Sequence, residues 1–159
     1  HPDFSNDIHH EVEILVKIKK EAKSVAKEFA NNYYDEIGLG IDFTARDIQT
    51  KVKEKGLPWE RAKAFNGSAP ISEFISKKDF DLNNLNFSLH KNGQLVQAGN
   101  TNLMLWKIDE LIANISSFIL LKTGDIIFTG TPKGVGQVVI GDRLSGFIEN
   151  RQMFDFEIK

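Results

Sequence analysis

The stretch from residue 11 to residue 18 constrains the fold most, because two sets of side chains alternate along it. One set is Val12, Ile14, Val16 and Ile18, and the other is Glu11, Glu13, Leu15 and Lys17. A period of two predicts a half-buried strand, in which residues two apart face the same side. Glu11 and Glu13 are therefore expected to share one face of a rigid strand.

A third carboxylate, Asp42, follows the apolar residues of the segment 38–41. Three carboxylates suit a hard divalent cation such as Mg²⁺ or Mn²⁺, and they leave about three octahedral positions for water and substrate. Other interpretations remain open on local grounds. Glu11 and Glu13 could form a solvated face, Asp42 could cap the helix that starts near residue 44, and His9 on the same face would suit zinc or iron instead. In a regular strand His10 points the other way.

The composition indicates an ordinary globular domain. With 159 residues, 41% hydrophobic and 26% charged, one domain is expected. A net charge of -2 gives no basic surface for nucleic acid, so no nucleic-acid partner is expected. The chain has no cysteine, which excludes disulfides and thiolate sites and favours the cytoplasm. The longest apolar run, 108–121, is interrupted by polar residues, so no membrane partner is expected either.

The remaining patterns favour an α+β fold with a mixed or antiparallel sheet, because helices and strands do not alternate regularly. Helices are predicted over residues 21–35, 45–55 and 107–121, the second ending at Gly56. Asn92-Gly93 between two strand-like runs predicts a hairpin with a type I′ turn. Further strands are predicted to start near Gly38 and over residues 125–129, 141–148 and 152–158.

Several other polar side chains are candidates for a binding site. Arg46 and Gln49 lie three apart on a predicted helix and so share one side, although a surface salt bridge would explain them as well. Lys63 has apolar neighbours, so it either extends to solvent or faces an anion. The glycine-rich segment 130–136 lacks the ending of a phosphate-binding loop, and its Thr131 is expected to donate to a small ligand.

Taken together, five segments resemble the fumarylacetoacetate hydrolase family, in particular its acylpyruvate hydrolase and oxaloacetate decarboxylase branch. They are Ile8 to Glu13, Gly40 to Gln49, Trp59 to Phe65, Gln97 to Thr101 and Gly124 to Gly136. The resemblance implies a strand-rich, mixed β-roll with about three helices, a homodimer, and Mg²⁺ or Mn²⁺ at Glu11, Glu13 and Asp42. It also implies a catalytic, substrate-side role for Lys63 and substrate binding by Arg46, Gln49 and Thr131.

The reaction that the resemblance implies is cleavage of the carbon–carbon bond of a 3-acylpyruvate, with the metal stabilising the enolate that leaves. Oxaloacetate decarboxylation and a 2-hydroxyhepta-2,4-diene-1,7-dioate isomerase-type reaction are alternatives, as is a domain that binds metal and 2-oxo acid without turnover. Residues 1–159 are expected to form the catalytic domain. The family's N-terminal lid, with a His and a Glu that act on water, is expected to be missing from a chain that begins at His1.

Overall fold

The computed structural model describes all residues from His1 to Lys159 as a strand-rich α+β fold, as the sequence predicts. Its strands are β1 Ile8–His10, β2 Val12–Ile18, β3 Tyr34–Ile41, β4 Thr44–Ala45, β5 Ile75–Ser76, β6 Asn86–Lys91, β7 Gln94–Asn100, β8 Ile126–Phe128, β9 Gly136–Gln137, β10 Arg143–Ile148 and β11 Arg151–Glu157. Its α-helices are α1 Lys27–Ala30, α2 Arg46–Glu54, α3 Glu60–Lys63 and α4 Ile108–Phe118, and three short 3₁₀ turns cover Asn31–Tyr33, Lys77–Asp79 and Thr101–Leu103. None of these helices has the length and apolar character needed to cross a bilayer.

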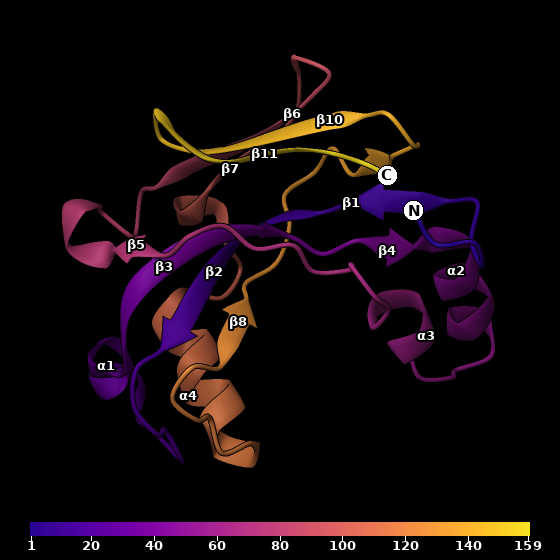
Figure 1. Ribbon diagram of the computed structural model, residues 1–159. Coiled ribbons are helices and arrows are strands. Elements are labelled where there is room, and N and C mark those ends of the chain that lie inside the picture. The colour runs from indigo at the N-terminus through magenta and orange to yellow at the C-terminus, as the bar shows by residue number, and fades with distance from the viewer.

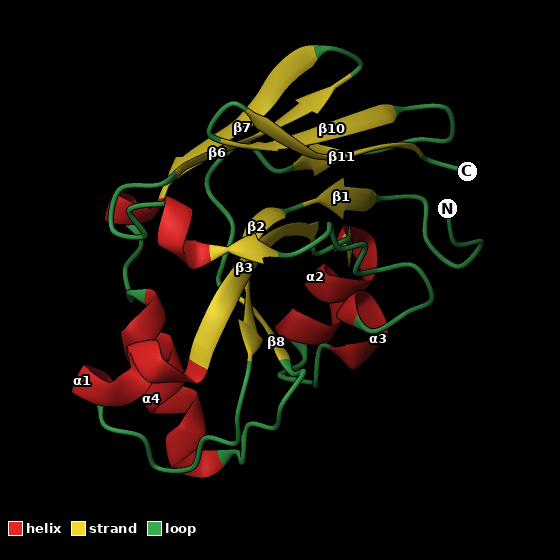
Figure 2. Cartoon of the chain, turned by 60° about the vertical axis from the view of Figure 1, so that its left-hand side comes forward, coloured by secondary structure: helices red, strands yellow, loops and turns green.

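The strands form three sheets, with the orders β5-β3-β2-β8, β11-β10-β6-β7 and β4-β1-β9. Every pair of neighbouring strands is antiparallel. Figure 1 shows the β6-β7-β10-β11 sheet lying across β2 and β3, with α2 and α3 on one side of β2 and α1 and α4 on the other. Figure 2 shows the same separation of the helices into two groups.

The core has two parts, and β2 contributes to both. Val12 and Ile14 belong to the larger cluster, together with residues of β3, β6 and β10, whereas Val16 and Ile18 belong to the smaller one, together with residues of α4. Leu15, on the opposite face, is fully buried too. The prediction of a half-buried strand is therefore wrong in this respect: β2 is an inner strand that is covered on both faces.

The predicted helix over residues 21–35 is largely wrong. Only Lys27–Ala30 forms an α-helix, and β3 begins at Tyr34, before the predicted start near Gly38. Ala22 exchanges backbone hydrogen bonds with Leu121, and the Ser24 N–H donates to the Ser116 carbonyl near the end of α4. Pairing with a distant segment thus outweighs the helix propensity of the Ala- and Lys-rich sequence.

Other local predictions are confirmed. Helices α2 and α4 fall within the predicted ranges, and Gly56 follows α2 with φ of 63°. Asn92 and Gly93 have φ of 53° and 78°, as a type I′ hairpin turn requires. Strands β8, β10 and β11 lie where strands were predicted. The short strands β4, β5 and β9 were not predicted, because two residues carry no periodic signal.

Candidate metal centre

The backbone brings Glu11, Glu13 and Asp42 together where β2 begins and β3 ends. In the β2–β3 ladder Glu13 lies opposite Gly40, and the Asp42 N–H donates to the Glu11 carbonyl at 2.9 Å. One carboxylate oxygen from each of the three residues lies within 4.8 Å of the other two. Glu11 and Glu13 are buried, and Asp42 is half-buried. The structure therefore assembles the three predicted carboxylates into one cluster.

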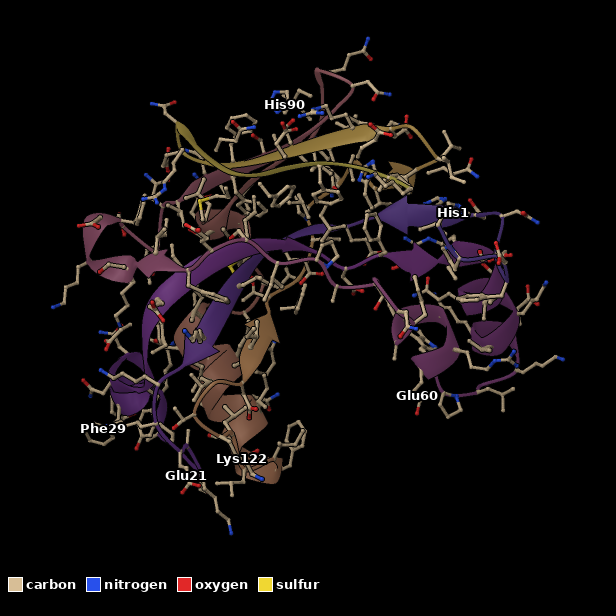
Figure 3. The ribbon with its side chains drawn as sticks, in the orientation of Figure 1. His1, Glu21, Phe29, Glu60, His90 and Lys122 are labelled. Carbon is tan, nitrogen blue, oxygen red and sulfur yellow. The ribbon has the colours of Figure 1, made fainter.

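Two cations reach this cluster from the neighbouring helices α2 and α3. The Lys63 ammonium donates to Glu11 Oε2 at 2.8 Å and to Asp42 Oδ2 at 2.6 Å. It also donates to the Thr44 hydroxyl at 2.6 Å. Figure 3 places Glu60, the first residue of α3, on the side of the molecule that carries α2. Lys63, the last residue of the one-turn helix α3, thus lies beside the carboxylates, as the resemblance implies.

Arg46 and Gln49 also lie at the cluster, on the first turns of α2. Arg46 Nη2 donates to Glu11 Oε1 at 2.5 Å, and its Nη1 donates to Gln49 Oε1 at 2.5 Å. Because the Gln49 oxygen faces Arg46, its amide nitrogen points elsewhere and remains a donor. The residue that caps α2 is Ala45, which offers no side-chain bond, so Asp42 is not the helix cap that local sequence allowed.

Burial and charge shift the pKa values of these groups in different directions. Burial raises the pKa of Glu13 to about 7, although a hydrogen bond from the Gly130 N–H opposes this rise. Burial also raises the pKa of Asp42, and Lys63 only partly offsets it. For Glu11, burial acts in the same direction, but hydrogen bonds from Lys63 and Arg46 outweigh it and the pKa falls. The cluster therefore resists carrying three negative charges unless a further cation joins it.

Thr131 lies next to the cluster, but its hydroxyl is already engaged. It donates to the Val12 carbonyl at 2.9 Å and accepts from Gln97 Nε2 at 2.9 Å. The neighbouring Gly130 N–H donates to Glu13 Oε2 at 2.6 Å. The loop that follows β8 therefore meets the carboxylates through a backbone amide. Donation from the Thr131 hydroxyl to a ligand stays a prediction, and it would require the hydroxyl to leave the Val12 carbonyl.

Neither His9 nor His10 belongs to the cluster. His9 Nε2 lies 2.8 Å from Asp7 Oδ1, and the buried His10 Nδ1 lies 2.8 Å from Gln97 Oε1. The regular alternation assumed for residues 9–13 is interrupted at Glu11, which separates β1 from β2. The competing hypothesis of a His/Glu/Glu zinc or iron site therefore has no support from the side-chain positions.

The donor set fits a hard divalent cation. All three candidate ligands offer carboxylate oxygens, which Mg²⁺ and Mn²⁺ prefer over softer metals. The sequence did not single out Gln97 or Thr44, although both contact predicted site residues. Gln97 lies within one of the five segments of the resemblance, but nothing in its local pattern indicates its contacts.

Sequence comparison finds a family model and several relatives that match this chain. The family model described as fumarylacetoacetate (FAA) hydrolase C-terminal matches residues 1–159. The chain is 39% identical to the mitochondrial oxaloacetate tautomerase of Homo sapiens, over 99% of this chain and 72% of the relative. It is 42% identical to an oxaloacetate tautomerase of Escherichia coli, over 91% of this chain and 67% of the relative.

Solved structures of the same family also match this chain. Fumarylpyruvate hydrolase of Pseudomonas aeruginosa in complex with Mn²⁺ and pyruvate matches with a TM-score of 0.92 and 31% identity, covering 100% of this chain and 68% of that one. A yeast protein of the fumarylacetoacetate hydrolase family matches with a TM-score of 0.85 and 35% identity, covering 96% and 68%. From the family model, the relatives and the fold together, this chain belongs to the fumarylacetoacetate hydrolase family.

Proposed function

We propose that this chain is an enzyme that acts on small 2-oxo acids with a divalent cation, Mg²⁺ or Mn²⁺, held by Glu11, Glu13 and Asp42. The observation that carries the proposal is the cluster of three carboxylates within 4.8 Å, flanked by Lys63. The Mn²⁺ and pyruvate in the related fumarylpyruvate hydrolase support it. A plain structural role would leave three buried or half-buried carboxylates without a reason to be together.

The chemistry needed is stabilisation of negative charge on an enolate. When bound, the cation supplies Lewis acidity toward a 2-oxo acid. Lys63 and Arg46 add positive charge on the side of α2 and α3, where substrate carboxylates are expected to bind. The amide nitrogen of Gln49 is a further donor, since its oxygen accepts from Arg46. Residues 1–159 thus form the catalytic domain in this proposal.

The first reaction we propose is the interconversion of the keto and enol forms of oxaloacetate, in which a proton moves between C3 and the 2-oxo oxygen through the enolate of oxaloacetate. Decarboxylation, which releases CO₂ and leaves the enolate of pyruvate, is a slower second reaction. Neither needs an attacking water molecule. Within residues 1–159, His9 is bonded to Asp7 and His10 to Gln97, so neither histidine is placed to activate water at the carboxylates. Relatives named oxaloacetate tautomerase support this choice.

Hydrolysis of 3-acylpyruvates is the second candidate. Its leaving group is the enolate of pyruvate, and it also requires a base that activates water. The likeness to fumarylpyruvate hydrolase favours it. The isomerase-type reaction on a hydroxydienedioate is the third candidate, because it also places negative charge on an enolate.

A direct test follows the enol absorbance of oxaloacetate, pyruvate release and acylpyruvate cleavage, with Mg²⁺ and with chelator. We expect cation-dependent loss of the enol signal, and we expect Asp42→Asn to abolish it. The exposed Asp79→Asn variant is the matched control. Rates that are the same with chelator and with Mg²⁺ contradict the proposal, whichever substrate reacts.

We also propose that two copies of the chain associate. Three apolar side chains lie exposed beside one another in the segment that leads into α4: Leu103, Leu105 and Trp106, at 78%, 97% and 52% exposure. They line a cavity of about 460 Å³ together with Met104 and the loop after β8. Light scattering measures the molar mass of wild type and of Leu105→Asp; a monomeric wild type would contradict the proposal.

The cytoplasm remains our proposed compartment, because the chain has no cysteine.

A further inference from the structure

Gln97 on β7 joins two segments of the candidate metal centre through a fully paired buried amide. Its side chain is 1% exposed. The oxygen Oε1 lies 3.0 Å from the Val12 nitrogen and 2.8 Å from His10 Nδ1. The nitrogen Nε2 donates to Thr131 Oγ1 at 2.9 Å and to the Pro132 carbonyl at 3.0 Å. Removing one partner of such a buried group costs more than the bond itself contributes, because the other partner is left without one.

Two backbone groups fix which way the amide of Gln97 points. The Val12 N–H can only donate, so the amide oxygen must face it. The Pro132 carbonyl can only accept, so the amide nitrogen must face the loop. His10 then carries its proton on Nδ1, the nitrogen that faces this oxygen. The amide therefore has one orientation, since a flipped amide would leave the Val12 N–H and the Pro132 carbonyl unpaired.

The amide also closes a ring of hydrogen bonds around the peptide groups of Val12. The Thr131 hydroxyl that accepts from Gln97 donates to the Val12 carbonyl at 2.9 Å. Strand β8 pairs with β2 only from Leu15 to Lys17, so no strand covers this edge of β2 at Val12. Side chains from β7 and the loop take the place of that strand. Val12 lies between Glu11 and Glu13, so its backbone sets the directions of both side chains.

The same loop contacts Glu13 directly and is held against β7. Its Gly130 N–H donates to Glu13 Oε2 at 2.6 Å. Gly134 has φ of 101°, and a Cβ there would lie 2.3 Å from the Val96 carbonyl oxygen. The loop backbone thus lies directly on β7 beside Gln97. Movement of the Gln97 amide would therefore disturb the Gly130 hydrogen bond to Glu13 as well as the Val12 peptide.

We propose that Gln97 is a positioning residue of the metal centre, which aligns Glu11 and Glu13 for the cation through Val12, Thr131 and the loop after β8. The inference rests on the proposed function, since it assumes that these carboxylates bind the cation. Gln97 contacts neither the cation nor the substrate in this arrangement. It acts through the backbone between two ligands, which distinguishes it from every residue that the sequence had singled out.

The test measures the Mn²⁺ dissociation constant of the folded protein by electron paramagnetic resonance of free Mn²⁺, well below the melting temperature. Gln97→Met keeps the size and neutrality of the side chain and removes all four bonds. Thr131→Val removes only the hydroxyl, and Thr131→Ser restores it. Gln94→Met, at an exposed position of the same strand, is the control. We expect Gln97→Met and Thr131→Val to weaken Mn²⁺ binding about 10- to 100-fold. Thr131→Ser and Gln94→Met should stay within about twofold of wild type.

A merely structural Gln97 would lower the melting temperature and leave the dissociation constant of the folded protein unchanged, and this result overturns the inference. If Gln97→Met does not fold, Thr131→Val with its Ser rescue decides the question alone. Wild-type protein that binds no Mn²⁺ overturns the proposed function and the inference together. Wild type that binds Mn²⁺ and turns over substrate, with both variants equal to it, overturns only the role of Gln97.

Discussion

The ammonium of Lys63 lies 2.6 Å from a carboxylate oxygen of Asp42, within the cluster of acidic side chains. Both side chains are about a quarter exposed, at 24% and 27%. An incoming cation therefore competes with an ammonium that solvent already reaches. This contact links α3 to the candidate metal centre, and it makes Lys63 a probe for cation and substrate binding.

Replacing Lys63 with methionine should change cation and anion binding in opposite directions. Removing the ammonium relieves competition for Glu11 and Asp42, so Mn²⁺ should bind about tenfold more tightly. Oxalate, which resembles the enolate of pyruvate, should bind more weakly by roughly 1 to 3 kcal/mol to the Mn²⁺ form. Calorimetry measures both, with the exposed Lys51→Met as control. Unchanged oxalate affinity would show that Lys63 does not face the ligand.

Asp42→Asn should weaken Mn²⁺ binding at least about 100-fold, since the charge of the ligand set largely determines cation affinity. The fold should persist, because the Asp42 backbone N–H keeps its bond to the Glu11 carbonyl. Calorimetry gives the affinity, and circular dichroism of the metal-free protein gives the melting temperature. A large fall in that temperature would mean that Asp42 is mainly structural.

The raised pKa of Glu13 should make the free energy of unfolding depend on pH in the absence of metal. The group loses its proton near pH 4.5 when unfolded and near 7 when folded, because burial raises its pKa. Between these values the folded state binds more protons, so this group's contribution to stability is present at low pH and is lost as pH rises toward 7. The Glu13→Gln variant should not lose this stability, because its amide does not ionise.

The measurement for Glu13 is the melting temperature of Glu13→Gln minus that of wild type, in chelator. The difference should grow between about pH 5 and about pH 8, by the equivalent of roughly 3 kcal/mol. Saturating Mg²⁺ should reverse it, because the cation stabilises only the wild-type carboxylate. A difference that stays constant with pH would show that Glu13 ionises normally in the folded protein.

Arg46→Lys should raise KM for the 2-oxo acid about tenfold with a smaller effect on kcat, because a lysine cannot bond Glu11 and Gln49 together. Steady-state kinetics at saturating Mg²⁺ measure the change. The exposed Arg61→Lys variant on α3 provides the comparison. Equal KM values for the two variants would show that Arg46 does not bind the substrate.

The sequence predicts those parts of the structure that depend on neighbouring residues. The Asn92-Gly93 turn and helix α4 follow from local backbone preference and from 3.6-residue periodicity. The segment 21–35 does not, because hydrogen bonds from Ala22 and Ser24 to a distant part of the chain determine its path. Local helix propensity does not predict hydrogen-bond partners that are distant in the sequence.

The candidate site divides in the same way. Strand parity placed Glu11 and Glu13 together, and the resemblance to a family placed Asp42, Lys63, Arg46 and Gln49. The engagement of the Thr131 hydroxyl with Val12 and Gln97 was not predictable, since those residues lie 119 and 34 positions away. Contacts at such separations arise only when the sheets that carry β2 and β7 have packed together.

The most direct measurement is an anomalous difference map from crystals of this protein soaked in Mn²⁺. We expect one peak with carboxylate oxygens of Glu11, Glu13 and Asp42 within about 2.5 Å of it. We also expect the Lys63 ammonium to leave those oxygens. A peak at another place, or one that lacks any of the three carboxylates, would show that this cluster is not the metal centre.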